Sequence, residues 1–389
     1  MNRKLWLLAA AQGLFLTNNV TFIAINGLVG LALAPWGWMA TLPVMGYVVG
    51  GALSTQLVAA TQSRYGRQIS FQLGAAVAFA SALLCAYAAW SHNFYLLCLA
   101  TVVAGYFNAN AQLYRFAAAE LVEASGREKA VSLVMAGGLI GAVLGPNMAA
   151  ATRGLFAVPF VGAYVALAGV ALLSIALLAC IDFPPRAAGK VTQGGRPLAQ
   201  IMRQPIFIVS AAAGALGYGV MNLLMASTPI AMQQCNLPFS ATALVLEWHV
   251  IGMFAPSFVT GHLIKRFGAL PIMGVGVSLN ALCIATALSG VDVAHFVVAL
   301  FALGVGWNFV FTSSTTLSLQ AYTPEEKDRA QGALNFCVFA TLAVTSFASG
   351  LLVTTQGWQL LNWGSLLPVV LTGMAVIYLL LNKRSMGTS

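Results

Sequence analysis

The sequence predicts an all-α membrane protein with twelve transmembrane helices in two similar halves. First, 60% of its 389 residues are hydrophobic and 7% are charged, whereas a soluble domain carries about 25% charged residues. Second, the hydrophobic residues form stretches of roughly 20 residues, the length that a helix needs to cross a hydrocarbon core of about 30 Å. Third, motifs of the first half recur in the second half. The stretches lack the alternation of barrel strands, so helices are expected.

Six hydrophobic stretches are expected in each half. Their approximate limits are 5–30, 38–60, 70–90, 95–118, 130–151 and 158–180, followed by 206–228, 241–264, 270–289, 294–318, 330–354 and 360–381. The first stretch begins like a signal peptide but stays apolar to Leu33 without a convincing cleavage site, so it is expected to be a retained span. A polar linker at 184–204, rich in Pro and Gly, divides the chain into six-helix bundles at 1–183 and 205–389.

The net charge of +9 follows the expected loops. Arg153 is the one cation in an opposite-side loop, and Arg115 lies at the inner end of the fourth span. All other Lys and Arg residues lie in the termini or in every second loop, at positions 3, 4, 64, 67, 127, 129, 186, 190, 196, 203, 265, 266, 327, 329, 383 and 384. This asymmetry places both termini in the cytoplasm, and it makes the basic charge a topology signal rather than a nucleic-acid surface.

A short motif follows the second span and recurs after the eighth. Residues 64–67 read Arg-Tyr-Gly-Arg, and residues 261–268 read Gly-His-Leu-Ile-Lys-Arg-Phe-Gly. Gly66 and Gly268 are 202 residues apart, which is about half the chain. A constant offset of this size indicates two related six-helix units.

This motif resembles the loop signature of the major facilitator superfamily, Gly-x-Leu-x-Asp-Arg-x-Gly-Arg. The resemblance implies a major facilitator fold, and loops that lock the two bundles together in one conformation. Ser63 and Lys265 stand where the family has an acidic residue, which leaves the locking chemistry in doubt. The matching residues, expected to act in conformational change, are Arg64, Gly66 and Arg67 in the first half and Gly261, Arg266 and Gly268 in the second.

Glu247 is the only acidic residue inside an expected span, and possible metal ligands lie near it. His249 and Met253 are four residues apart in the eighth span, so they share a helix face, as do Met221 and Met225 in the seventh. Both pairs are expected at a similar depth. Thioether and imidazole ligands together suit Cu(I), whereas Mg, Ca and Mn prefer oxygen ligands.

Other interpretations of these residues are open. Met is a common filler of hydrophobic cores, and a membrane His is often a packed, hydrogen-bonded residue or part of a proton relay. Glu247 could then be a proton site. Further polar or aromatic residues of the spans could line a pathway for any small polar substrate; they include Asn18, Asn19, Trp307 and Asn308.

The Met-x-x-x-Met motif of the seventh span and the His-x-x-x-Met motif of the eighth resemble those of the CcoA-type bacterial copper importers, a branch of the same superfamily. The resemblance implies Cu(I) import across the bacterial inner membrane by alternating access, for haem-copper oxidase assembly. Met221, Met225, His249 and Met253 would bind the metal, while Cys235 and Met232 in the outer loop could capture it. Copper is then the cargo rather than a cofactor. The expected protein is a monomer in the bilayer, with periplasmic or cytoplasmic copper chaperones as candidate partners.

Two rival functions are open, and the second belongs to another class. One is a proton-coupled facilitator that exports a small organic compound or drug, with Glu247 as its proton site. The other is a membrane sensor or assembly factor that binds metal without transport. No nucleotide-binding loop, catalytic triad or haem motif is visible in the sequence, so we do not expect an enzyme.

The charge asymmetry generates a topology prediction. A reporter enzyme that is active only in the cytoplasm should be active when it is fused at either terminus or within 184–204. A reporter that is active only on the opposite side of the membrane should be active when it is fused next to Cys235. Reporter activity in intact cells measures this. A cytoplasmic location for the loop around Cys235 would contradict the predicted orientation.

Overall fold

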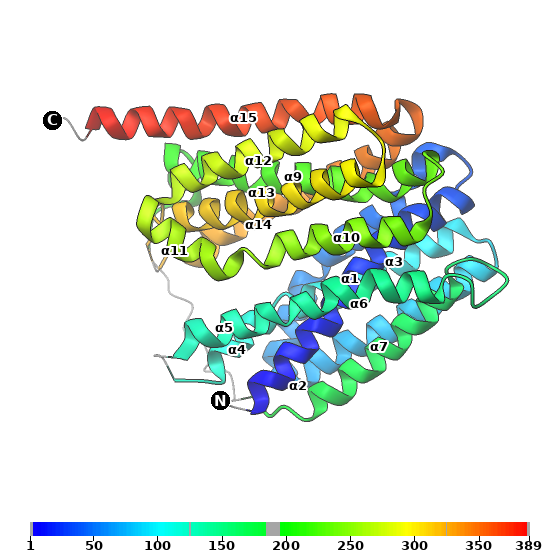
Figure 1. Cartoon of the computed structure of the whole chain (residues 1–389). Helices are drawn as coiled ribbons and strands as arrows, with labels where there is room; N and C mark the ends of the chain where they lie inside the picture. The colour runs from blue at the N-terminus through cyan, green and yellow to red at the C-terminus, as the bar shows by residue number, and fades with distance from the viewer. Residues whose placement is uncertain (1–2, 124–125, 184–194, 324, 387–389) are drawn as a thin grey trace.

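The computed structural model describes residues 3–123, 126–183, 195–323 and 325–386, and these residues form helices with no strand among them. Both ends of this described chain lie at the same end of the molecule, which we call the termini end (Figure 1). The helices of the first half are α1 (Arg3–Leu33), the 3₁₀ helix η1 (Gly37–Met39), α2 (Leu42–Trp90), α3 (Phe94–Ala111), α4 (Tyr114–Glu120), α5 (Arg127–Ala136), α6 (Gly138–Thr152) and α7 (Val161–Ala179). The later helices are α8 (Leu198–Met202), α9 (Pro205–Gln234), α10 (Phe239–Phe254), α11 (Ser257–Phe267), α12 (Ala269–Ser289), α13 (Val293–Ser318), α14 (Lys327–Thr355) and α15 (Gly357–Met386).

These helices account for the twelve expected spans. Within the described ranges, 10 helical segments are long and apolar enough to cross a membrane, and the bent pair α10 and α11 makes an eleventh. The twelfth arises because α2 contains two spans joined at Gly66, where φ is +79°. The all-α membrane fold is therefore confirmed. The limits predicted for the bundles and linker stay predictions, since residues 184–194 lie outside the described ranges.

The repeated loop motif has the same geometry in both halves. Gly66 and Gly268 adopt φ of +79° and +88°, a conformation that favours glycine and turns the chain from one span into the next. The guanidinium of Arg64 lies over the ring of the following residue, Tyr65, at 5.2 Å from its centroid. In the second half Arg266 covers the ring of Phe267 in the same way, at 5.1 Å. A Cβ added at Gly261 would have no neighbour within 4 Å among the described residues.

Arg67, the last residue of the first-half motif, is paired with an acid outside the motif. Its Nε donates to Oε2 of Glu120 at 2.6 Å, and its side chain is 8% exposed. Glu120 ends α4, so this pair ties the turn between the second and third spans to the end of the fourth. A carboxylate from another helix thus supplies the partner that Ser63 in the motif cannot.

The two halves meet mainly at the end away from the termini, which we call the far end. Helices α1 to α7 form one group and α9 to α15 the other (Figure 1). At the far end one hydrophobic core includes residues of both groups, whereas toward the termini end each group has cores of its own. Thr41 beside η1 donates to the carbonyl of Ser346 on α14 at 2.6 Å, and the ring of Trp38 packs edge-to-face on Phe347 at 6.0 Å. The far end is therefore the closed end in this conformation.

The eighth span is broken between α10 and α11, and Asn308 of α13 binds the break. Its Nδ2 donates to the carbonyl of Met253 at 2.8 Å and to Oγ of Ser257 at 2.7 Å. Its Oδ1 accepts from Oγ1 of Thr260 at 2.7 Å. A helix that bends by 40° at Pro256 frees backbone groups, which a neighbouring side chain must bind inside a membrane. Asn308 thus stabilises the bend.

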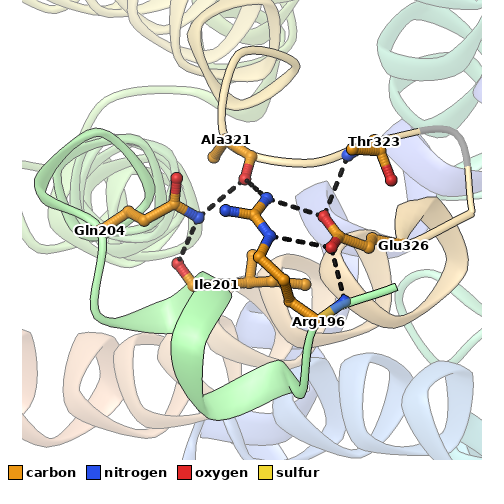
Figure 2. A network of polar contacts seen from close by, with 6 residues as sticks. All are labelled: Arg196, Ile201, Gln204, Ala321, Thr323 and Glu326. Carbon is orange, nitrogen blue, oxygen red and sulfur yellow. Dashed lines mark hydrogen bonds and ion pairs between the residues drawn. The ribbon is translucent and has the colours of Figure 1, made fainter. Parts of the chain in front are cut away.

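The segment before α9 is fixed to the second half by one ion pair (Figure 2). Backbone N and Nε of Arg196 donate to Oε1 of Glu326 at 2.7 and 2.9 Å, and Nη2 donates to Oε2 at 2.8 Å. The backbone N of Thr323 also donates to Oε2, at 3.0 Å. Arg196 and Gln204 both donate to the carbonyl of Ala321, at 3.0 and 2.8 Å. The hydrogen bonds from Arg196 lower the pKa of Glu326 from 4.5 to about 2.

The first prediction from the fold concerns Glu326. Replacing it with Gln removes the carboxylate and should lower the melting temperature by a few degrees at pH 7. Because the pKa of Glu326 is lowered on folding, its stabilisation is complete above pH 4.5 and is lost as the pH falls toward about 2. Thermal unfolding in detergent between pH 3 and pH 7 measures this.

Glu123→Gln, at an exposed acid of the first half, is the matched control and should leave the melting temperature unchanged. A difference between wild type and Glu326→Gln that stays constant from pH 7 down to pH 3 would contradict the ion pair.

The second prediction concerns Asn308. Asn308→Ala removes three hydrogen bonds, each worth about 0.6 kcal/mol between membrane helices, so about 2 kcal/mol of stability should be lost. Thr260→Val removes one of the three and should have about a third of the effect. Thr315→Val, at an exposed residue that bonds only within its own helix, is the control. Equal effects of all three substitutions in chemical unfolding would show that Asn308 has no special role.

Candidate functional site

Toward the termini end, Arg115 of α4 presents a cation to the second half. Its side chain is half-buried, and its Nε is shielded from solvent without a hydrogen-bond partner in the described chain. Tyr218 of α9, in the other half, lies within electrostatic range of it. A buried donor without a partner costs about 1–3 kcal/mol. Such a group, at the boundary between the two halves, is suited to bind a ligand.

Tyr218 belongs to a group of four aromatic side chains of the second half. The rings of Trp307 and Phe311 are stacked, with centroids 5.3 Å apart and planes 10° apart. Tyr218 meets both edge-to-face, at 5.1 and 5.2 Å, and Phe254 lies against Trp307 at 6.4 Å. Nε1 of Trp307 is also buried without a partner among the described residues. We call these four residues, Tyr218, Phe254, Trp307 and Phe311, the aromatic cluster.

Helix spacing and small residues build this cluster. Trp307 and Phe311 are four residues apart on α13 and therefore share a face. Helix α13 approaches α10 closely at Gly304, where an added Cβ would lie 2.3 Å from the carbonyl of His249. Phe254 ends α10 directly before the break and also lies near Gly138 of the first half. The cluster thus lies where helices of both halves meet.

The arrangement is suited to a flat, polar ring system. Half-buried aromatic faces stack on planar rings, and edge-to-face pairs fix their positions. The guanidinium of Arg115 and the indole N–H of Trp307 can donate to carbonyl or ring-nitrogen acceptors of a ligand. Neither donor has such a partner in the described residues. Arg115 and the aromatic cluster together are the candidate site.

The four predicted metal ligands lie inside the hydrophobic core. Met221, Met225 and Met253 are 3%, 4% and 7% exposed and belong to the core shared by the two halves. His249 is fully buried, with Nδ1 at 2.7 Å from the carbonyl of Leu300 on α13, while its Nε2 has no described partner. No group of three or more His, Cys, Asp or Glu residues that could hold a metal occurs among the described residues.

The predicted capture residues differ in exposure. Cys235 follows the end of α9 and is partly exposed, whereas Met232, one turn earlier, is fully buried. The buried thioether is therefore not at the surface beside the thiol. Their role in capture stays a prediction.

The predicted pathway residues are in different surroundings. Oε2 of Glu247 accepts from Nδ2 of Asn147 at 2.7 Å, a bond that links α10 to α6 of the first half. Asn18 is buried, and Asn19 beside it lies 3.4 Å from the hydroxyl of Tyr47. Asn308 binds the break in the eighth span. Of the predicted set, only Trp307 belongs to the aromatic cluster.

Sequence reasoning missed most of this site. Arg115 was treated as a topology charge, and Tyr218, Phe254 and Phe311 were not singled out. Two signals could have found them: a cation within the apolar stretch 95–118, and a Trp followed by a Phe four residues later in a predicted span. Neither signal shows that residues of α4, α9 and α13 meet, because that depends on how the halves pack.

Comparison with known proteins identifies relatives along the whole chain. The chain is 36% identical over 390 residues to the riboflavin transporter RfnT of Brucella anthropi, covering 100% of this chain and 97% of that protein. It is 26% identical to the uncharacterized MFS-type transporter YddS of Bacillus subtilis, covering 87% of this chain and 82% of the relative.

Solved transporters share the fold at low sequence identity. The peptide transporter PepTSo matches with a TM-score of 0.75 at 11% identity, covering 100% of this chain and 99% of that one. The nucleoside transporter NupG also has a TM-score of 0.75, at 10% identity, covering 97% of this chain and 99% of that one. Likenesses at this identity show the fold alone.

The riboflavin transporter overturns the prediction of copper import. Copper as cargo, copper chaperones as partners and a role in oxidase assembly are wrong, because a full-length relative carries a vitamin. The physical reason is that Met and His residues four apart on a helix also arise where a buried face fills a core. Met221, Met225 and Met253 are all buried in that way.

The predicted superfamily, in contrast, is confirmed. The family model for the Major Facilitator Superfamily matches residues 5–255 and 211–388, which together span nearly the whole chain. The described chain is a multi-pass helical membrane protein, and its relatives of known type are transporters rather than enzymes. This chain belongs to the Major Facilitator Superfamily.

Proposed function

We propose that this protein transports riboflavin, or a flavin with the same ring system, across a membrane by alternating access. The observation that carries the proposal is the 36% identity to a riboflavin transporter over the full length of both chains. The proposed location is the bacterial inner membrane with both termini in the cytoplasm, which the distribution of Lys and Arg favours.

The candidate site supports this cargo chemically. Riboflavin carries a flat tricyclic ring with carbonyl and ring-nitrogen acceptors at one end and a hydroxylated chain. The ring can stack in the aromatic cluster, where Trp307 and Phe311 already show nearly parallel planes. Its acceptors can accept hydrogen bonds from the N–H groups of Arg115 and Trp307, which lack partners in the described chain. Riboflavin is uncharged, so its entry does not neutralise Arg115.

The conformation fits one stage of the transport cycle. The halves share one core at the far end and have separate cores toward the termini end. A ligand would therefore reach Arg115 and the aromatic cluster from the termini end, on the cytoplasmic side of the proposed orientation. Rocking of the halves around the site would expose it to the other side, as in other transporters built from two related halves.

The third prediction tests the cargo and the site together. In proteoliposomes loaded with unlabelled riboflavin, the wild type should accumulate labelled riboflavin by counterflow, which needs no knowledge of direction or driving ion. Tyr218→Leu removes a stacking partner worth about 1–3 kcal/mol, so riboflavin affinity should fall about 5- to 150-fold. Tyr378→Leu, at a tyrosine of α15 that is 52% exposed, is the matched control and should transport normally.

Competition then separates ring recognition from chain recognition. Lumichrome, which has the ring without the ribityl chain, should inhibit the counterflow, and ribitol should not. Folded wild-type protein without riboflavin counterflow would contradict the proposed function. Normal counterflow in Tyr218→Leu would instead support the proposed function and contradict the assignment of the aromatic cluster as the binding site.

A further inference from the structure

A cavity lies at the far end, between the two halves and away from the aromatic cluster. Its volume is about 380 Å³, within the range of pockets that hold small organic ligands. The first half contributes the outer end of α1, His92 after α2, and the segment with Arg153 and Phe160 between α6 and α7. The second half contributes the outer end of α9 and Phe239 at the start of α10. We call it the far-end cavity.

Arg153 connects the two halves at the edge of this cavity. Its guanidinium lies 5.2 Å from the ring centroid of Phe160 in its own half and 5.7 Å from that of Phe239 in the other. The two rings meet edge-to-face at 5.0 Å. Arg153 is exposed, and its N–H groups make no hydrogen bond to the described residues, so they can still donate to a ligand.

The remaining lining is apolar with a few polar groups. Leu28 and Val29 form part of an apolar wall, and Gln233 and Thr242 offer an amide and a hydroxyl. Nδ1 of His92 already contacts the carbonyl of Ala89 at 3.1 Å, which holds that ring in place. Two phenyl rings, one planar cation and apolar walls are a combination suited to a flat ring that carries hydrogen-bond acceptors.

We propose that the far-end cavity is a second binding site for the transported flavin ring. It is used from the side of the membrane opposite to the termini end, from which the candidate site is reached. This inference rests on the proposed function. The ring lies against the face of one of the two nearly perpendicular rings of Phe160 and Phe239 and against the edge of the other. Its carbonyl oxygens accept hydrogen bonds from Arg153. Because Arg153 also holds the rings of both halves, ligand binding there competes with the contact that keeps the far end closed.

The test measures riboflavin stoichiometry in the purified full-length protein in lipid nanodiscs, where both faces are accessible. Titration followed by quenching of riboflavin fluorescence should give two binding sites in the wild type. Arg153→Gln should weaken riboflavin binding at one of these sites at least tenfold. Tyr218→Leu should weaken riboflavin binding at the other site. Arg203→Gln, at an exposed arginine of the termini end, is the charge-matched control and should retain both.

A second measurement needs no substitution at Arg153, in case that variant does not fold. Cys235 is partly exposed and lies between the lining residues Gln233 and Leu237. Riboflavin should slow its labelling by a maleimide at least threefold, in the wild type and equally in Tyr218→Leu. Cys180, an exposed cysteine after α7, is the internal reference and should label at an unchanged rate.

The outcomes distinguish this inference from the proposed function. Riboflavin counterflow with a single binding site that is insensitive to Arg153→Gln would overturn the second site alone. Protection of Cys235 that disappears in Tyr218→Leu would also overturn it, because the effect would then come from the candidate site. Absence of riboflavin counterflow and of any riboflavin binding in the wild type would overturn the proposed function and this inference with it.

Discussion

The packing of the two halves at the far end is the contact on which ligand access depends. One core continues from the first half into the second there, through residues such as Val29 and Ile230. The bond from Thr41 to Ser346 and the contact of Trp38 with Phe347 lie at the same end. Because close-packed cores have discrete arrangements rather than continuous ones, loss of this contact would be a switch between two states.

Polar residues inside the spans divide into two kinds by their partners. Asn308 makes three hydrogen bonds at the break in the eighth span, and Glu247 accepts one from Asn147 across the halves. These bonds join different helices and help to hold them together in the membrane. Arg115 and Trp307 keep donors without partners in the described chain. Such donors are the better guide to a ligand, because a bound molecule supplies what they lack.

The sequence predicted the fold well because its signals are local. Spans follow from stretches of apolar residues, and the two glycines that mark the repeated motif, at 66 and 268, both adopt a positive φ. The candidate site could not be predicted from the sequence in the same way, because it depends on contacts between distant segments. His249 and Met253 share a helix face, yet the sequence does not say whether that face meets a pathway or the backbone of α13. The structure shows Nδ1 of His249 against the carbonyl of Leu300.

The position of Arg115 also limits how the protein can select its cargo. A cation in a membrane span is costly unless it is paired or lies beside a water-filled path, and no acidic side chain is paired with Arg115 in the described residues. A permanently anionic ligand would therefore bind it strongly and leave slowly. A neutral ring with carbonyl acceptors binds through hydrogen bonds and stacking alone, which favours release in each cycle. An uncharged flavin meets this requirement, whereas a phosphorylated flavin would add charge that must cross the membrane with it.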